Sequence, residues 1–496
     1  MNPKQKHLQE LVMRAERAKA QGQEAVARTL WIAALALDNN NAMIHRELSL
    51  SFGEQLDNVP ALQHAHMWYL IQPNNPEAHW VYGLMLYRSN HLDQAIKILT
   101  PLSQSQPSWP NINLVMAKLH LTKRALEQSD SYFKKAVEQT ASNPQENAST
   151  RWEHAMLQLT QSDYANGWDN HETRLQSIGW AQLHLCPLPA PTWAGESLKN
   201  KTIVVHGEQG IGDEIMYASM LPDLLAQGAH VILACYAAIA NVMRTSFPSA
   251  TVVEHPRGLV HVEEWRQGIM PDWWQQLLND GIHIDYQIPM GSLAHILRRD
   301  ASLFPRTPYL IIEASRQANV KNILYARAQE QGVTLNGKKC IALAWCGNLE
   351  NPHGRAKSLD LQQLQGLGQI AKAHNAVFVS LQNRQYGYQA IEALANNQLP
   401  IIDMSPYTDQ FADTLALASI CDHIITIDTS YAHLCGAAGL PALMLLRRNC
   451  DWRWGWVKND SDWYNCLELI RQDVDGDWTP TIKKTEEKLS KWLTNA

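Results

Sequence analysis

The chain has 496 residues, of which 45% are hydrophobic and 18% are charged. This length exceeds the size of a single core and predicts about three domains. Its 42 Lys and Arg and 48 Asp and Glu give a net charge of -6, which argues against a nucleic-acid or anionic-lipid partner. The 8 cysteines form no C-x-x-C pair, so we expect reduced thiols and no structural metal site.

The amino-terminal segment and the apolar runs bear on location. Residues 1–20 are polar and helical in pattern, without the apolar region and cleavage site of a secretion signal. The longest apolar run, residues 231–240, has about half the length of a spanning helix. We therefore expect a soluble, cytoplasmic protein with no stable membrane insertion.

Residues 1–180 carry an internal repeat. The segment LALDNNNA at 35–42 recurs as LIQPNNPEA at 70–78, a period of 35, and prolines continue that phase as far as Pro144. The clearest copy contains Trp80, Gly83, Leu84, Tyr87, Ala95 and Leu99, a pattern that resembles the tetratricopeptide (TPR) helix–turn–helix unit. We expect Gly83 at the tight contact between paired helices, and Trp168 in a last, degenerate copy. The alternative is an irregular helical domain whose prolines recur by chance.

A TPR-like array would have a consequence for binding. Stacked helix pairs form a concave groove that accepts an extended peptide or a helix of another protein, which predicts a protein partner. The alternative is that the helices only brace the remainder of the chain.

The remaining chain alternates strands and helices. In residues 181–330, four runs read as buried strands: 202–207, 230–236, 250–255 and 282–288. After a helical connector at 314–331, residues 331–496 contain five more: 340–347, 376–382, 399–405, 423–428 and 441–446. This pattern predicts two doubly wound α/β domains whose ligand loops follow the strands and face a shared cleft.

The first candidate loop follows the strand at 202–207. It reads Gly207-Glu208-Gln209-Gly210-Ile211-Gly212-Asp213, and its glycine spacing differs from the G-x-G-x-x-G of dinucleotide-binding folds. A nicotinamide enzyme is therefore disfavoured. The glycines permit a close backbone approach at a helix start, and Asp213 serves the mouth of the cleft, caps the helix, or does both.

Two further loops lie in the last third of the chain. Asp428, Thr429 and Ser430 end a strand before a helix; we expect Ser430 to cap it, the free N–H groups to attract phosphate, and His433 to face the ligand. The other loop contains Gly347 and Asn348, and turn residues then present Arg355 and Lys357, two cations suited to a diphosphate. The alternatives are a packed core histidine and an exposed charged loop.

Several segments together resemble bacterial TPR-containing glycosyltransferases related to the ADP-heptose heptosyltransferases. They are GEQGIGDEIMYASMLPDL (207–224), ALAWCGN (342–348), QFADTLALASICDHIITIDTSYAHLCGAAGLP (410–441), and DWRWGW with DSDWYNCLELIRQ (451–456 and 460–472). The resemblance covers most of residues 150–480, and its strongest part is D-T-x-x-x-H-L-x-x-A-x-x-x-P.

The resemblance implies a GT-B architecture of two Rossmann-like domains. The acceptor would lie over the first, at 181–330, and the nucleotide sugar in the second, at 331–496, with no metal or other cofactor. By the same resemblance Asp213 matches the proposed general base, Lys357 the diphosphate lysine, and Asp428, Thr429 and His433 the donor-diphosphate loop. Fixed positive charge at such a loop can stabilise the leaving diphosphate of an inverting transfer without magnesium.

Two departures shift the expected substrates. Ser430-Tyr431 stands where heptosyltransferases have a small residue after Asp-Thr, and those enzymes lack the helical array. We therefore expect transfer to a protein, a flagellar or surface protein being one candidate. The alternatives are a non-catalytic TPR adaptor with a degenerate GT-B scaffold, and a lipopolysaccharide or glycan sugar transferase.

Tryptophan usage is uneven, with 18 Trp against 6 Phe. Several tryptophans fall at the repeat phase of the helical array. Five others, Trp452, Trp454, Trp456, Trp463 and Trp478, follow the last expected strand. This C-terminal group is expected to wall the cleft or to tie down the last helix.

Overall fold

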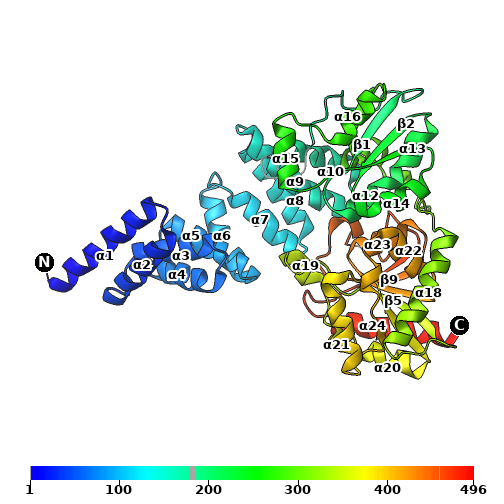
Figure 1. The fold of residues 1–496 in the computed structure, drawn as a ribbon. Helices are drawn as coiled ribbons and strands as arrows, with labels where there is room; N and C mark the ends of the chain where they lie inside the picture. The colour runs from blue at the N-terminus through cyan, green and yellow to red at the C-terminus, as the bar shows by residue number, and fades with distance from the viewer. Residues whose placement is uncertain (1, 178–185, 457, 496) are drawn as a thin grey trace. The chain divides into compact units, whose positions relative to one another are not determined.

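The computed structural model describes residues 2–177, 186–456 and 458–495, in two compact units, Met1–His154 and Ala155–Ala496 (Figure 1). The expected order, a helical repeat array followed by two Rossmann-like α/β domains, is confirmed. The domain boundary expected at residue 180 lies outside the described residues.

The first unit consists of helices in which each packs on the next. They are α1 (Pro3–Ala20), α2 (Glu24–Leu37), α3 (Ala42–Glu54), α4 (Asn58–Ile71), α5 (Pro76–Arg88), α6 (Leu92–Ser105), α7 (Ile112–Thr122), α8 (Leu126–Gln139) and the start of α9 (Pro144–Thr160). Asn2, Asn41 and Asn75 cap α1, α3 and α5 through their side chains, which explains the recurring Asn before these helices.

Gly83 lies at the tight contact expected from the sequence. A Cβ atom on Gly83 of α5 would lie 2.4 Å from Cδ2 of Leu99, which is fully buried on α6. Successive hydrophobic clusters, such as the one around Leu86, Leu99 and Met116, link each helix pair to the next. The unit is thus a linear array in which each pair completes its neighbour's core.

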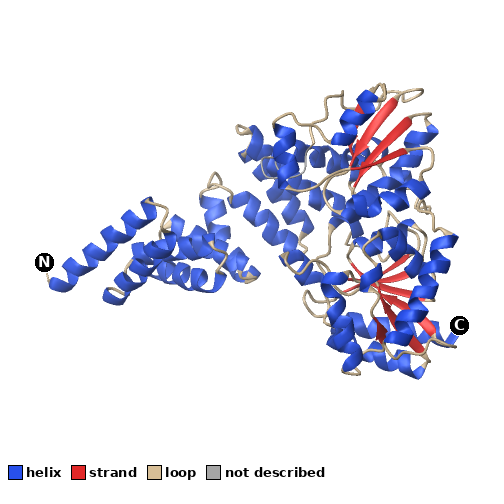
Figure 2. Cartoon of the chain, in the orientation of Figure 1, coloured by secondary structure: helices blue, strands red, loops and turns tan. Residues whose placement is uncertain are grey.

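The second unit contains α10 (Tyr164–His171) and two parallel sheets, seen as two sets of red arrows in Figure 2. The elements of the first sheet region are β1 (Thr202–His206), α12 (Ile211–Tyr217), α13 (Leu221–Ala226), β2 (His230–Cys235), α14 (Ala237–Ser246), β3 (Thr251–Glu254), α15 (Leu259–Arg266), α16 (Asp272–Asn279), β4 (Tyr286–Pro289) and α17 (Leu293–Leu297). The strand order is β3-β2-β1-β4, with every pair parallel.

The second sheet is longer. Its elements are α18 (Ala314–Glu330), β5 (Lys339–Leu343), α19 (Pro352–Lys357), α20 (Gln365–Ala373), β6 (Ala376–Ser380), α21 (Gly387–Ala395), β7 (Ile401–Ile402), α22 (Phe411–Ser419), β8 (His423–Ile427), α23 (Ser430–Ala437), β9 (Ala442–Leu446), β10 (Leu467–Arg471) and α24 (Thr479–Asn495). The order is β10-β9-β8-β5-β6-β7, again parallel throughout.

Most strand residues are buried, and neighbouring residues of one strand belong to different core clusters, so each sheet is covered on both faces. In β1, Ile203 and Val205 join the core formed with α12 to α14, whereas Val204 packs with Trp265 and Trp273 of α15 and α16. One core cluster runs from these helices into the second sheet, which accounts for the single compact unit.

One expected strand differs from the structure, and one strand was not expected. The run at 282–288 begins as loop, since Ile282 and Ile284 pack beneath α15 and α16, and β4 starts only at Tyr286. The unexpected strand is β10, at the sheet edge, where the exposed Glu468 is followed by two buried residues, so the sequence shows neither regular alternation nor a continuous apolar run.

The tryptophans are redistributed relative to expectation. Trp168 belongs to the second unit rather than to the array: its ring meets Trp452 edge-on at 5.4 Å, and its Nε1 donates to the Arg298 carbonyl at 2.9 Å. Trp478 packs with Ile482 and Leu489 of α24 and so holds the last helix. Trp454 instead contacts the loop after β8.

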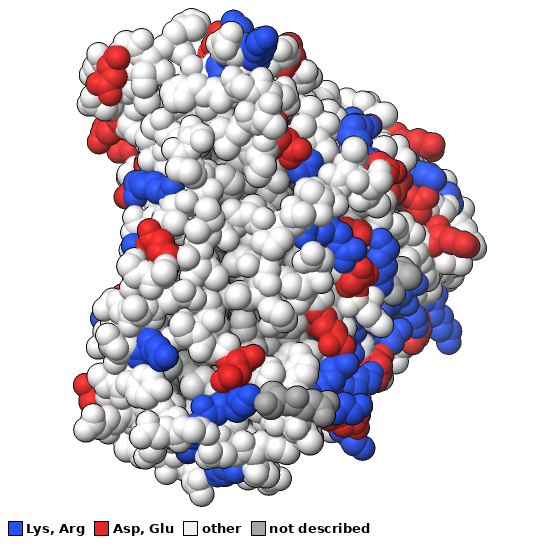
Figure 3. Space-filling view, turned by 90° about the vertical axis from the view of Figure 1, so that its right-hand side faces the viewer, with Lys and Arg blue, Asp and Glu red and all other residues white. Residues whose placement is uncertain are grey.

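Within the described part of the chain, no helix is long and apolar enough to cross a membrane. Figure 3 shows acidic and basic side chains interspersed on one face, with wide areas that carry neither. On that face neither sign of charge forms an extended field.

The contact at Gly83 can be tested by adding one methyl group. We expect Gly83→Ala to lower the free energy of unfolding of the first unit by about 1–3 kcal/mol, because Leu99 is fully buried and has no room to move aside. Gly53→Ala in α3 is the matched control, since its Cβ would lie 3.3 Å from Cε of Met85 and 3.6 Å from Nη1 of Arg88, both at the far ends of flexible side chains. Urea unfolding of both variants provides the measurement, and equal losses would show that Gly83 is not specially constrained.

Candidate active site

The expected loops converge because of the sheet topology. In the second sheet the chain runs outward from β5 to β7 and then returns with β8 beside β5, so the loops after β5 and β8 flank the point where the strand order reverses. In the first sheet the corresponding loops follow β1 and β4. Ligands of doubly wound sheets bind at such points, beyond the carboxyl ends of the strands.

The loop after β1 is held by close packing. A Cβ on Gly207 would fall 1.9 Å from Oε1 of Glu214, and a Cβ on Gly212 would fall 2.9 Å from Cδ2 of His433 and 3.4 Å from Cα of Ser430. Gly212 thus allows α12 to touch α23, which brings the loop that contains Asp213 against the loop that contains Asp428. Gln209 between the glycines has a φ of 60°, a left-handed conformation that non-glycine residues seldom adopt.

Asp213 occupies the first turn of α12. Its Oδ2 accepts a hydrogen bond from the Gly210 N–H at 2.7 Å, so the capping alternative is correct. Its Oδ1 lies 2.6 Å from the guanidinium of Arg453, and the Asp213 side chain is 17% exposed. The carboxylate therefore both caps the helix and reaches residues of the second α/β domain.

Glu208, one of the expected loop residues, is buried. Arg174 donates to both of its carboxylate oxygens, at 2.7 and 3.3 Å, and also to Ser292 Oγ at 2.8 Å. Burial raises the pKa of the Glu208 carboxyl above its ordinary value, although Arg174 opposes the shift. Because a Cβ on Gly291 would fall 1.9 Å from Glu208 Oε1, the loop after β4 closes over this pair. The buried pair of Glu208 with Arg174 thus fixes the position of the loop after β1.

The loop after β8 departs from expectation in one detail. Thr429, rather than Ser430, is the N-cap residue of α23, and its side chain makes no capping hydrogen bond; Ser430 is the first helical residue. Asp428 accepts a hydrogen bond at Oδ1 from Trp454 Nε1 at 2.9 Å, and its Oδ2 lies 3.5 Å from Lys357 Nζ.

His433 is packed among aromatic side chains. Its side chain is 4% exposed, its Nδ1 is hydrogen-bonded to the Tyr464 hydroxyl at 2.9 Å, and its ring centroid lies 4.8 Å from that of Trp454. Burial lowers the pKa of His433 to about 3, so the imidazole is neutral at neutral pH. The buried His433 ring lies against Gly212 and so fixes the contact between α12 and the start of α23.

The loop after β5 separates the two expected cations. Arg355 and Lys357 lie in the short helix α19 rather than in an open turn. The exposed Arg355 donates to the carbonyls of Leu349 and Glu350, at 2.8 and 3.1 Å, whereas Lys357 points toward Asp428. Lys357 Cε lies 3.4 Å from the Cβ position of Gly347, and the exposed Asn348 closes its own turn through the Glu350 N–H. Of the two cations, Lys357 is the one that faces the loop after β8.

Arg453 is a site residue that the sequence interpretation missed. Besides Asp213, its guanidinium contacts Asp451 Oδ1 at 2.7 Å and Gln209 Oε1 at 3.1 Å, and it lies 4.3 Å from the ring centroid of Trp452. Burial disfavours the charged form, yet Asp213 and Asp451 together raise the pKa of Arg453 above its ordinary value. The only sequence signal was its position in DWRWGW.

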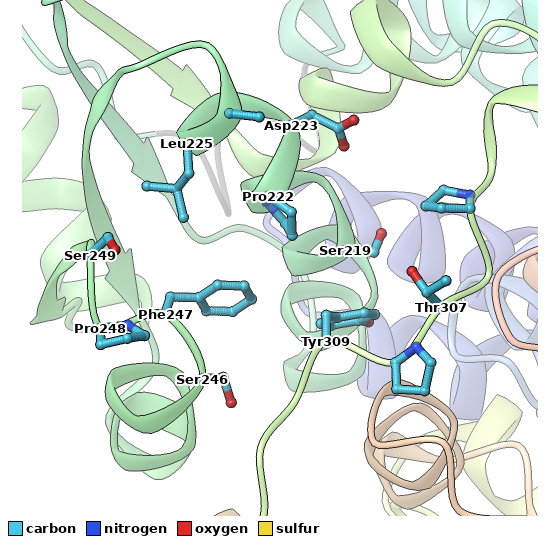
Figure 4. Close-up of a pocket in the computed structure, with 13 residues that line it drawn as sticks. Ser219, Pro222, Asp223, Leu225, Ser246, Phe247, Pro248, Ser249, Thr307 and Tyr309 are labelled. Carbon is cyan, nitrogen blue, oxygen red and sulfur yellow. The ribbon is translucent and has the colours of Figure 1, made fainter.

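Hollows in the described part of the second unit include the following two. One, of about 210 Å³, adjoins Arg453 and is lined mainly by residues 159–162, Tyr164 and residues 452–456. The other, of about 620 Å³, is drawn in Figure 4 and contains Phe247, Tyr309 and several prolines. Leu225 and Phe247 lie just before β2 and β3, so this larger pocket lies at the amino ends of the strands of the first sheet. The candidate loops lie at the opposite, carboxyl ends of the strands.

The described residues contain no group of three or more His, Cys, Asp or Glu side chains placed to hold a metal ion. All eight cysteines are free thiols, and burial raises the pKa of Cys235 to about 12.

Comparisons with known proteins give the following similarities. No family model matches the chain. Protein FlbA of Caulobacter vibrioides is 26% identical over 369 residues, which cover 71% of this chain and 57% of FlbA; the chain thus aligns with little more than half of that relative.

Solved structures are similar to separate parts of the chain. A glycosyl transferase family 9 structure from Veillonella parvula aligns with 61% of this chain and 99% of its own, at 12% identity and a TM-score of 0.45. A TPR protein from Thermus thermophilus aligns with 35% of this chain and 92% of its own, at 16% identity and a TM-score of 0.27. These are the two kinds of protein that the sequence motifs resemble, and the fold itself rests on the elements described above.

The burial of His433 predicts a pH dependence of stability. Its folded pKa of about 3 lies below the ordinary value near 6.5, so acid protonates the unfolded chain first and stability is lost as pH falls below about 6.5. By pH 5 this costs about 2 kcal/mol. In urea titrations at pH 7 and 5, we expect His433→Gln to lose less stability than the parent by that amount. The control is His283→Gln, because the His283 side chain is 86% exposed; this variant should lose as much stability as the parent between pH 7 and pH 5. An equal loss in His433→Gln would show that His433 does not cause the pH dependence.

Proposed function

We propose that this chain is a metal-independent, inverting glycosyltransferase that transfers a sugar from a nucleotide-sugar donor to a protein. The observation that carries the proposal is the meeting of Asp213 and the Lys357–Asp428 loops, at the points where both sheets reverse their strand order. A carboxylate and fixed positive charge at one place are what such a transfer requires.

In the proposed reaction, the acceptor, the donor and Asp213 each have a separate role. The acceptor hydroxyl oxygen attacks the anomeric carbon of the donor, and the bond from that carbon to the diphosphate oxygen breaks. Asp213 takes the hydroxyl proton, and the bonding electrons leave with the diphosphate. The configuration at the anomeric carbon is inverted because the nucleophile enters opposite the leaving group.

The leaving diphosphate has a suitable place at α23. The first N–H groups of this eight-residue helix lack intrahelical partners and carry the positive end of the helix dipole. Lys357 adds a positive charge beside the same turn, while its partner Asp428 accepts a hydrogen bond from Trp454. These donors supply the stabilisation that magnesium provides in other transferases.

The protein acceptor is proposed from the first unit. A linear array of helix pairs presents a surface on which extended peptides bind. Activity on proteins is tested by incubating the chain with nucleotide sugars and candidate flagellar or surface proteins, followed by mass spectrometry. Transfer to lipid or glycan acceptors alone would contradict the protein acceptor, and a lack of nucleotide binding would favour a non-catalytic adaptor.

Asp213 provides the direct test of catalysis. We expect Asp213→Asn to lower turnover about 100-fold or more, because the amide cannot accept the proton, while nucleotide binding is not weakened. The Asn side chain retains an oxygen to accept the Gly210 N–H, so folding should be preserved. Donor turnover and calorimetric nucleotide affinity are the two measurements, and near-normal turnover would remove Asp213 from this role.

Lys357 and Arg355 form a matched pair for the donor site. We expect Lys357→Ala to weaken nucleoside diphosphate binding about 10-fold or more, since a charge-assisted contact is lost. Arg355→Ala removes an equal charge from the same helix, but one bonded to backbone carbonyls, and should change affinity much less. Calorimetry with a panel of nucleoside diphosphates measures both, and equal effects would point to a general electrostatic contribution instead.

A further inference from the structure

Arg453 connects the two α/β domains at the place where the reaction is proposed to occur. It lies in the short turn Trp452–Trp454 that follows β9, in the second domain. Its guanidinium contacts Asp213 and Gln209 of the first domain, at 2.6 and 3.1 Å, and Asp451 of its own turn at 2.7 Å. It is thus paired with the same carboxylate that is proposed to accept the proton.

This pairing conflicts with catalysis if it persists. A carboxylate oxygen committed to a guanidinium 2.6 Å away is a poorer proton acceptor and occupies the space that the acceptor hydroxyl needs. Both side chains are largely buried, with 12% and 17% exposed, so water screens the pair weakly. Something in the catalytic cycle must therefore draw Arg453 away from Asp213.

The neighbouring contacts indicate what does so. Trp454, next to Arg453 in the turn, donates to Asp428, which in turn faces Lys357. The turn therefore ties Arg453 to the loop at the start of α23. Arg453 Nε is buried and has no hydrogen-bond partner among the described residues, so the guanidinium retains a donor for a further acceptor.

We propose that Arg453 binds the diphosphate of the nucleotide-sugar donor and, in doing so, releases Asp213 to act as the base. This inference rests on the proposed glycosyltransferase function and deepens it. A diphosphate offers several charged oxygens to which a planar guanidinium binds bidentately, so it competes effectively with two single carboxylate contacts. The donor would then bind before the base becomes available, which protects the site from activating a hydroxyl without a donor.

The experiment compares nucleoside diphosphate affinity by calorimetry in four full-length proteins: the parent, Arg453→Gln, Asp213→Asn, and the double variant. We expect Arg453→Gln to weaken binding about 10-fold or more. Asp213→Asn should tighten binding several-fold, because Arg453 loses its competitor, and this gain should vanish in the double variant. Arg299→Gln is the control, since Arg299 makes a comparable 2.6 Å pair with Asp169.

The outcomes separate the inference from the function beneath it. If the parent binds no nucleoside diphosphate, the proposed function fails and the inference with it. If the parent binds and Arg453→Gln binds equally well, only the inference fails. Thermal unfolding checks that each variant is folded. Should Arg453→Gln not fold, Arg453→Lys in the Asp213→Asn background replaces the double variant, and an unchanged affinity in Asp213→Asn alone overturns the proposal.

Discussion

The contact of α12 with α23 is the constraint on which the rest of the site depends. It joins the first turn of a helix in one α/β domain to the first turn of a helix in the other, and Gly212 makes it possible, because a side chain there would meet His433 and Ser430. Each sheet positions its own loops, but only this contact places Asp213 within reach of residues from the second domain. The neutral, buried His433 is part of that contact surface, so its packing and the geometry of the site are linked.

Each cation at the site is paired with at least one carboxylate. Arg453 contacts Asp213 and Asp451, and Lys357 lies 3.5 Å from Asp428, so three carboxylates face two cations. Burial of an unpaired charge is costly, and these pairs lower that cost. In the proposed function, a diphosphate would replace carboxylates as the partner of Arg453 and Lys357. Donor binding would then be coupled to the release of those carboxylates, with no metal ion in the scheme.

Much of this organisation could be predicted from local patterns. The period of the repeat, the strand runs and the glycine-rich turn each depend on residues close in the chain, and they predicted the helical array, the described strands other than β10, and the helix start at which Asp213 lies. Gly83 was predictable for the same reason, because a glycine in a repeated helix marks a close neighbour. The error at β4 arises because buried loop residues precede the strand, and β10 was missed because its buried residues follow no regular pattern.

The remainder depends on residues far apart in the chain, which no local pattern reports. Arg355 and Lys357 look alike in sequence, and only the fold shows that one bonds to its own loop while the other faces Asp428. Arg453 and Asp213 lie far apart in the chain, in different domains. In the segment DWRWGW the tryptophans stand out, and the importance of the arginine between them does not. A tryptophan pair fixes where the turn lies, through Asp428 and Trp168. The arginine between those tryptophans is thereby held at the domain junction, where its charge acts on the proposed base.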